Sequence, residues 1–95
     1  MEIVLTDHLL SRLKLRKIPK SLALKTYNQK EGLLYDTVSQ HFIGLSKHKL
    51  FSKMRLMVVA FDRLENRVKL VTLYPTTEKE VKSKIKSGRW KYVKS

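Results

Sequence analysis

Cysteine is absent from this chain of 95 residues, and glycine occurs only three times and proline twice. Without cysteine there can be no disulfide framework and no thiolate zinc site, which are the usual staples of small secreted proteins. No apolar run approaches the ~18 residues that a membrane span requires, and residues 1–7 lack the charged and apolar regions of a signal peptide. We therefore expect a cytoplasmic protein with no membrane partner.

Repeats and linkers are missing as well. The chain contains no internal repeat, no low-complexity stretch and no linker rich in Pro, Gly or Ser. Its length and its hydrophobic content of 42% suit one modest core. The prediction is a single domain over residues 1–95.

Acidic residues are scarce, with eight Asp and Glu against 21 Lys and Arg and a formal charge of +13. Such an excess attracts polyanions and supplies salt-sensitive affinity through counterion release. The alternative is a solvated surface tuned for solubility, but interspersed Lys and Glu would serve that better. A membrane surface fits less well, because no basic segment carries a broad apolar face. The composition favours nucleic acid, and RNA in particular, as the partner.

Two helices are expected near the N-terminus. Thr6 offers a capping oxygen to a helix over residues 7–17, whose apolar residues recur at helical spacing. Pro19 interrupts that pattern, since proline can begin a helix but cannot continue one, so a second helix should cover 19–30. Gly32 is well placed to end the second helix.

A third helix is expected near the C-terminus. Thr77 and Glu80 have the spacing of a capping box, in which each side chain satisfies the other residue's backbone N–H. The apolar face of this helix is narrow, essentially Val81 and Ile85, so it can only rest against a sheet. Gly88 should end it.

The remaining regular segments are β-prone, at residues 1–5, 33–38, 42–45, 55–61 and 68–74. The last two are the strongest, and the polar connection 62–67 suits an antiparallel hairpin, while Pro75 should stop the second strand. The predicted class is α+β, in the order β-α-α-β-β-β-β-α, with a mainly antiparallel sheet, two N-terminal helices and one C-terminal helix.

The first candidate site is a ridge on the first helix. His8, Arg12 and Arg16 lie four residues apart and therefore on one side of the helix. Two guanidiniums could hold a phosphodiester while the imidazole moves a proton, and Lys14 and Lys17 would add cations. The simpler alternative is that His8 sits at the helix start and the arginines form a solvated face.

The second candidate is the C-terminal cluster of Arg89, Trp90, Lys91 and Tyr92. Aromatic rings interleaved with cations suit base stacking and phosphate contact. The alternative is that Trp90 is a hydrophobic plug that docks the chain end onto the sheet.

The third candidate consists of strand cations. Period-two alternation would place Lys53, Arg55, Arg67 and Lys69 on one face of their strands, at the outer ends of the hairpin. Next to Arg89 they would form a basic cleft. The alternative is ordinary charge at strand ends.

Motifs for metal or cofactor chemistry are missing. His41 and His48 match no metal-ligand spacing, and there are no paired carboxylates, no phosphate-binding glycine loop and no nucleophile elbow. We therefore expect neither a metal nor a cofactor.

The chain resembles the small domains of unassigned function that are grouped near the BrnT and RelE/ParE-type toxins of bacterial and archaeal toxin-antitoxin systems. The resemblance covers most of the chain. It rests on three segments: His8-x3-Arg12-x3-Arg16-x-Ile18, the strand end Val71-Thr72-Leu73-Tyr74-Pro75, and Ile85-Lys86-Ser87-Gly88-Arg89-Trp90.

This resemblance implies an antiparallel sheet with two helices near its N-terminal side and, in ribonuclease members, cleavage of RNA without a metal. Only His8, Arg12, Arg16 and Arg89 match residue by residue, and Tyr74 is a further candidate proton carrier. The leading hypothesis is a toxin-like, metal-independent endoribonuclease that acts on RNA, on or off the ribosome, and is inhibited by an acidic antitoxin-like partner. The alternatives are a non-catalytic RNA- or DNA-binding module and a toxin that acts on a protein target.

Overall fold

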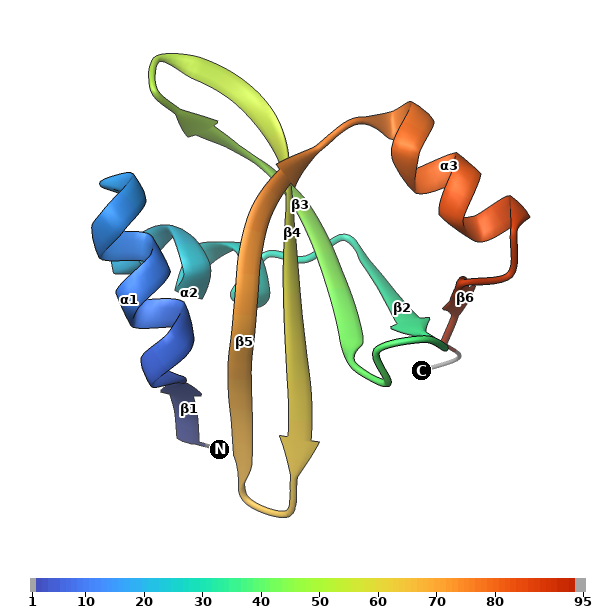
Figure 1. Cartoon of the computed structure of the whole chain (residues 1–95), viewed down its shortest axis with the longest axis horizontal. Coiled ribbons are helices and arrows are strands. Elements are labelled where there is room, and N and C mark those ends of the chain that lie inside the picture. Colours follow the sequence, from blue (N-terminus) through green and yellow to red (C-terminus); the bar gives the residue numbers. More distant parts are fainter. Residues whose placement is uncertain (1, 94–95) are drawn as a thin grey trace.

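A six-stranded sheet forms the centre of the molecule (Figure 1). The structure is a computed structural model that describes residues 2–93. The strands lie in the order β1-β5-β4-β3-β2-β6, and all neighbours are antiparallel except β1 and β5. Their bounds are Glu2–Leu5 for β1, Gly32–Asp36 for β2, Phe42–Leu50 for β3, Lys53–Leu64 for β4, Arg67–Thr76 for β5 and Trp90–Tyr92 for β6. The predicted α+β class with a mainly antiparallel sheet is confirmed.

Helices cover the two faces of the sheet unequally (Figure 1). Helices α1 (Asp7–Arg16) and α2 (Lys20–Asn28) pack on one face and enclose the larger core cluster, whereas α3 (Glu78–Lys86) packs on the other over a smaller one. The apolar face of α3 is Val81 and Ile85, as predicted. The two N-terminal helices and the C-terminal helix are therefore confirmed.

Local capping explains where the helices begin and end. The Thr6 hydroxyl accepts a hydrogen bond from the Leu9 N–H at 3.2 Å, as expected, and Lys17 ends α1 in the left-handed conformation with φ 57°. At α3 only half of the expected capping box forms. Thr77 accepts from the Glu80 N–H, but the Glu80 carboxylate accepts from the Thr76 hydroxyl at 2.8 Å.

Two expected breakpoints are wrong. The second helix stops at Asn28 and is not ended by Gly32. Gly32 is instead the first residue of β2. Pro75 does not stop β5, which continues to Thr76. Strand β1 pairs with β5 only through residue 70, so Pro75 lies where β5 has become an edge, and there a missing N–H costs little.

Strand β6 was not expected from the sequence. It contains only three residues, too few for periodicity to be visible, and it forms because Trp90 pairs with Asp36 of β2. Trp90 is buried by that long-range pairing, whereas Lys91 and Tyr92 stay exposed.

Strand β4 runs through the middle of both cores. Its residues 57–61 are all at most 4% exposed. Met57, Val59 and Phe61 point toward α1 and α2, while Val58 and Ala60 point toward α3. This strand of the predicted hairpin is therefore covered on both of its faces.

The Asp36 carboxylate ties β6 to the β2–β3 turn. Its oxygens accept from the backbone N–H groups of Val38 and Ser39 at 2.9 and 3.0 Å and from the Trp90 indole N–H at 3.0 Å. Arg89 adds an ion pair at 3.2 Å. Burial alone would raise the pKa of Asp36, but these donors and the Arg89 charge outweigh it and lower the pKa to about 2.

We expect Asp36→Asn to destabilise the protein by roughly 2 kcal/mol at neutral pH, because a lowered carboxyl pKa stabilises the fold above the ordinary value of that pKa. The stabilisation is lost as the pH falls from 3.8 through about 2, so the gap between wild type and variant should close there. Urea unfolding of both proteins at neutral pH and near pH 2 measures this difference in the free energy of unfolding. Glu65→Gln, at an exposed carboxylate of the β4–β5 turn, is the control. Equal unfolding midpoints for wild type and Asp36→Asn at neutral pH would contradict the proposed role of this carboxylate.

Candidate nucleic-acid interface

Helix α1 presents the predicted ridge to solvent. His8, Arg12 and Arg16 are exposed, and Arg12 Nε donates to His8 Nε2 at 3.1 Å. In this contact the guanidinium is the donor and the imidazole nitrogen is the acceptor. The structure brings His8 and Arg12 into direct contact on one helix surface.

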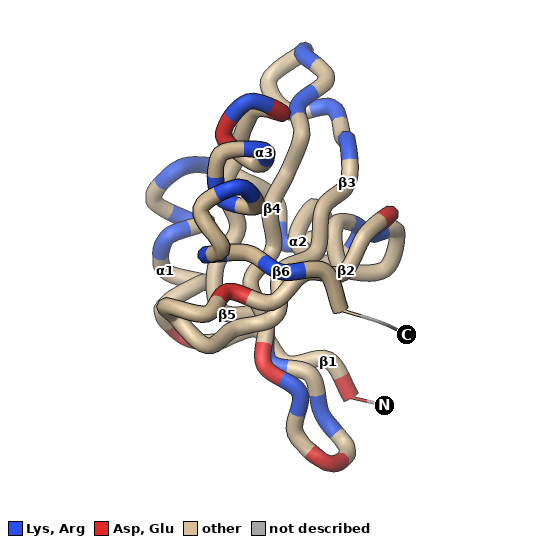
Figure 2. The backbone as a smooth tube through the Cα atoms, turned by 90° about the vertical axis from the view of Figure 1, so that its right-hand side faces the viewer, with Lys and Arg blue, Asp and Glu red and all other residues tan. Residues whose placement is uncertain are grey.

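The β3–β4 hairpin extends from the upper end of the sheet, and the coloured segments around its turn in Figure 2 are basic. Leu50 pairs with Lys53, so the turn consists of Phe51 and Ser52 alone. Both residues have positive φ, 51° and 66°. Two-residue hairpin turns of this type favour Asn and Gly, and a residue with a Cβ in the left-handed region costs about 1 kcal/mol. The turn is strained, and Phe51 is 62% exposed on it.

A groove joins this hairpin to the corner between α1 and α2. It has a volume of about 280 Å³ and is lined by Lys17, Pro19, Ser21, Leu22, Lys25, Lys49, Leu50 and Phe51. A neighbouring hollow on the same corner is lined by Leu10, Leu13, Lys14, Ile18, Pro19 and Lys20. Neither hollow is lined by a carboxylate.

We call this region the corner surface and define it as Lys14, Lys17, Lys20, Lys25, Lys49, Phe51, Lys53 and Arg55. Arg55 belongs to it because its Nε donates to the Leu50 carbonyl at 3.2 Å, at the base of the hairpin turn. The corner surface combines seven cations with one exposed aromatic ring. It brings together residues from two of the candidate sites that the sequence indicates, Lys14 and Lys17 from the first helix and Lys53 and Arg55 from the strands.

The predicted cleft of strand cations does not form. Lys53 and Arg55 begin β4, whereas Arg67 and Lys69 begin β5 at the other end of the hairpin, about 30 Å along the strand. The two pairs also face opposite sides of the sheet. Arg55 lies on the same side of β4 as Met57 of the larger core cluster. Lys69 lies between two residues of that cluster, Val68 and Leu70, and so points to the other side. The alternation of residues along a strand predicts which residues of that strand share a face. It does not predict which ends of two strands lie next to each other.

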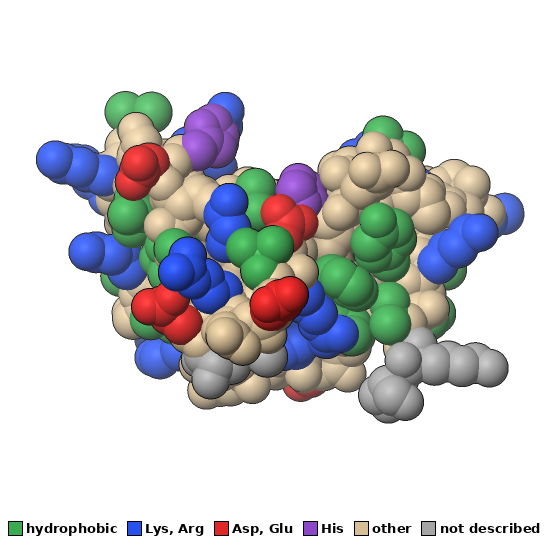
Figure 3. Space-filling model, turned by 90° about the horizontal axis from the view of Figure 1, so that it is seen from below, with side chains coloured by type: hydrophobic (Ala, Val, Ile, Leu, Met, Phe, Trp, Pro, Cys, Tyr) green, Lys and Arg blue, Asp and Glu red, His purple; other side chains and the backbone are tan. Residues whose placement is uncertain are grey.

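The lower end of the molecule carries both signs of charge (Figure 3). Arg67 pairs with Glu2 at 3.2 Å, and Lys69 lies opposite Asp62 in the β4–β5 register. These carboxylates offset the cations, so this end attracts a polyanion less than the corner surface does.

The C-terminal cluster is largely structural. Trp90 is only 1% exposed, so its ring cannot stack on a base, and its prediction as a nucleic-acid contact is wrong. It plugs the smaller core cluster and donates to Asp36. Arg89 is also held by Asp36, whereas Lys91 and Tyr92 remain exposed on β6.

Tyr74 and Arg89 lie on the α3 side of the sheet, apart from the α1 ridge. Tyr74 packs against the smaller core cluster, and its hydroxyl accepts from Lys84 Nζ at 3.5 Å. The pKa of Tyr74 is raised above its ordinary value. Burial is the main cause, the charge of Arg89 acts against it, and the charges of Asp36 and Glu80 add to it. Of the five residues predicted to be catalytic, the structure therefore groups His8 and Arg12 on α1, with Arg16 on the same helix, and Tyr74 with Arg89 on the opposite face of the sheet.

His41 and Asp62 form a contact that no pattern in the sequence indicates. His41 immediately precedes β3 and Asp62 lies in β4; the imidazole Nδ1 and the carboxylate Oδ1 are 2.6 Å apart, and both side chains are about one-third exposed. A carboxylate on one imidazole nitrogen fixes the tautomer and leaves the other nitrogen free for proton transfer. Only the strand register brings together residues that are 21 positions apart in the chain.

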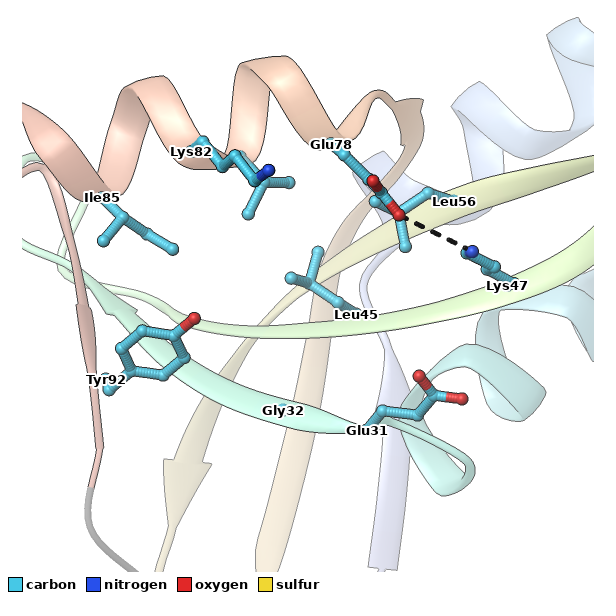
Figure 4. A pocket seen from close by; sticks show the side chains of 10 residues that line it. Glu31, Gly32, Leu45, Lys47, Leu56, Glu78, Lys82, Ile85 and Tyr92 are labelled. Carbon is cyan, nitrogen blue, oxygen red and sulfur yellow. Dashed lines mark ion pairs between the residues drawn. The ribbon is translucent and has the colours of Figure 1, made fainter.

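A third open hollow, of about 350 Å³, lies between α3 and the sheet (Figure 4). Its floor is apolar, with Leu45 and Leu56, and at its rim Lys47 and Glu78 form an ion pair at 3.7 Å. Since carboxylates line it alongside lysines, it lacks the single sign of charge that marks the corner surface.

Residues 2–93 hold neither a cluster of metal ligands nor a membrane-spanning helix. In that part of the chain no group of three or more His, Cys, Asp or Glu side chains could hold a metal ion. No helix there is long and apolar enough to cross a membrane.

Comparison with known proteins leaves the resemblance to the BrnT and RelE/ParE-type toxins a prediction. No family description, curated protein or solved structure matches this chain significantly.

Proposed function

We propose that this protein binds RNA and that the corner surface is where the phosphate backbone lies. The observation that carries the proposal is a concave region lined by lysines from three elements, with no carboxylate among its lining residues. The backbone of RNA is a row of negative charges, and a cationic groove with an accessible aromatic ring is the common solution for holding it.

The distribution of the acidic residues supports this choice of surface. Glu2 and Asp62 offset cations at the lower end, and Glu78 pairs with a lysine at the α3 hollow. The two hollows at the corner are lined by lysines and by no carboxylate. A polyanion drawn to the protein by its overall charge of +13 would meet cations there without an acidic residue among the lining side chains.

Binding should be strongly salt-dependent, and three groove lysines should account for a definable share of it. For single strands, the slope of log affinity against log salt falls by about 0.7 for each phosphate that the protein no longer neutralises. We expect the triple variant Lys17→Gln, Lys25→Gln, Lys49→Gln to lower the slope by about 2 and to weaken binding at about 50 mM salt. Fluorescence anisotropy with a short labelled RNA measures both.

The matched control is Lys79→Gln, Lys82→Gln, Lys86→Gln, which removes the same charge from exposed positions of α3. It should change the slope much less. If both triple variants weaken binding equally, the affinity comes from net charge and the corner surface is not the site. If the wild type does not bind RNA even at about 50 mM salt, the whole proposal fails.

A second candidate function is metal-independent RNA cleavage at α1. The observation in its favour is the contact between Arg12 Nε and His8 Nε2, which places an imidazole nitrogen beside a permanent positive charge. Cleavage by attack of the 2′-hydroxyl on the adjacent phosphate requires a base, charge neutralisation and orientation, and it requires no metal. Neighbouring phosphates would be held by Lys14 and Arg16 on the same helix and by Lys17 at its C-terminal end.

Incubation of the protein with RNA in EDTA tests this candidate. We expect cleavage that His8→Ala reduces by about 100-fold or more, the usual contribution of a general base, and that Arg12→Ala also reduces. Arg89→Ala and Tyr74→Phe, on the opposite face of the sheet, should retain it. If Arg89→Ala loses cleavage and His8→Ala fully retains it, the reaction takes place on the α3 side of the sheet. If the wild-type protein leaves the RNA intact, the protein binds RNA without cleaving it.

An acidic protein partner is the third element of the proposal. In the toxin hypothesis this partner is an antitoxin, and a carboxylate-rich segment could cover the corner surface because no acidic residue lines that surface. Such a partner would compete with RNA for the same cations.

A further inference from the structure

Phe51 stands at the tip of the hairpin in a position that the fold does not explain. Its ring is 62% exposed, and it belongs to neither core cluster. The neighbouring Leu50, at 6% exposure, fills the core at this end. Loss of the Phe51 side chain would therefore remove little buried apolar surface.

The backbone at this position disfavours phenylalanine. With φ of 51° and 66°, Phe51 and Ser52 adopt the two left-handed conformations that an Asn-Gly turn adopts at lower cost. A bulky residue held in such a conformation at an exposed site is a reason to look for function. The turn is energetically unfavourable, and it places an aromatic ring in the solvent.

The surroundings of the ring indicate what it would meet. Lys49 and Lys53 flank the turn, and Lys17 and Lys25 line the groove that Phe51 borders. Met54, 68% exposed, extends the apolar tip by one side chain. A single aromatic platform among phosphate-binding cations suits a nucleic acid whose bases are accessible.

We infer that Phe51 stacks on an unpaired base, so that the RNA bound at the corner surface is single-stranded. In a duplex the bases are stacked on one another and their faces are covered. Only the protein's cations, which contact the phosphates, could then contribute to the affinity. This inference rests on the proposed RNA binding and adds the class of RNA. A membrane surface is the poorer partner, because the exposed apolar area at the tip consists of Phe51 and Met54 and lacks a broad amphipathic face.

The test compares the wild-type protein with Phe51→Asn, Phe51→Trp and Ser52→Gly. Binding is measured at one salt concentration to a single strand of about ten nucleotides and to the duplex of the same sequence. Stacking on one base contributes a factor of roughly 5 to 150 in affinity, so Phe51→Asn should weaken single-strand binding by that factor and leave duplex binding unchanged. Phe51→Trp should retain binding, and its added indole fluorescence should be quenched by the single strand.

Thermal unfolding separates this role from a structural one. Phe51→Asn and Ser52→Gly both relieve the strained turn, so each should raise the melting temperature, by about 5 °C. Ser52→Gly keeps the ring and should keep the affinity. A variant that folds more stably and binds less well cannot owe its weaker binding to misfolding.

Three outcomes would overturn the inference. The first is unchanged single-strand affinity in Phe51→Asn while the triple variant of Lys17, Lys25 and Lys49 still binds weakly, in which case RNA binding stands without stacking. The second is equal loss of single-strand and duplex binding in Phe51→Asn. The third is Phe51-dependent binding to vesicles of mixed phosphatidylserine and phosphatidylcholine without Phe51-dependent RNA binding. Absence of any RNA binding by the wild type would instead defeat the proposed function itself.

Discussion

Burial of strand β4 on both of its faces is the interaction on which the rest of this structure depends. Five consecutive residues, 57–61, are shielded from water. Their side chains alternate between the core under α1 and α2 and the core under α3. Because each face must be covered, the chain needs helices on both sides of the sheet, and the short, lysine-rich α3 serves only because the cluster beneath it is small. This arrangement also separates the candidate sites, because α1 lies on one face of the sheet and Tyr74 on the other.

The uneven placement of eight carboxylates shapes the surface as much as the 21 cations do. Asp36 is committed to the β2–β3 turn and to the docking of Trp90, where it also holds Arg89. Others offset cations at the lower end of the sheet and beside α3. The corner where α1, α2 and the β3–β4 hairpin meet is left without one among the residues that line its hollows. A protein with this net charge gains no stability from concentrating lysines there, because like charges repel.

The hairpin tip shows a second cost to stability in the same place. The turn between β3 and β4 is the shortest that can connect paired strands, and its geometry requires two positive φ angles. Phe51 and Ser52 meet that requirement poorly. Repulsion among lysines and strain in the turn thus coincide at the corner surface, and sites that combine such costs are commonly those used for binding.

The elements and the fold class could be predicted from local signals along the chain. Capping at Thr6 and Thr77, the interruption at Pro19 and the two long apolar segments are such signals, and they predicted three helices and a mainly antiparallel sheet. The basic character of the surface follows from composition alone. Local signals misled where a residue's role depends on its neighbours in space: Gly32 begins a strand, and Pro75 is tolerated because β5 is an edge there.

Which charged residues share a surface depends instead on how the elements pack. Strand register placed His41 beside Asp62 and sent Arg55 and Lys69 to different ends and faces of the hairpin. The pairing of β6 with β2 buried Trp90, which the sequence left equally suited to base stacking and to the core. The packing of α1 and α2 against the sheet brought Lys17 and Lys25 to Phe51. Composition and periodicity record the environment of each residue along its own element, whereas a binding surface is made where several elements meet, and for this reason the corner surface could not be predicted from the sequence.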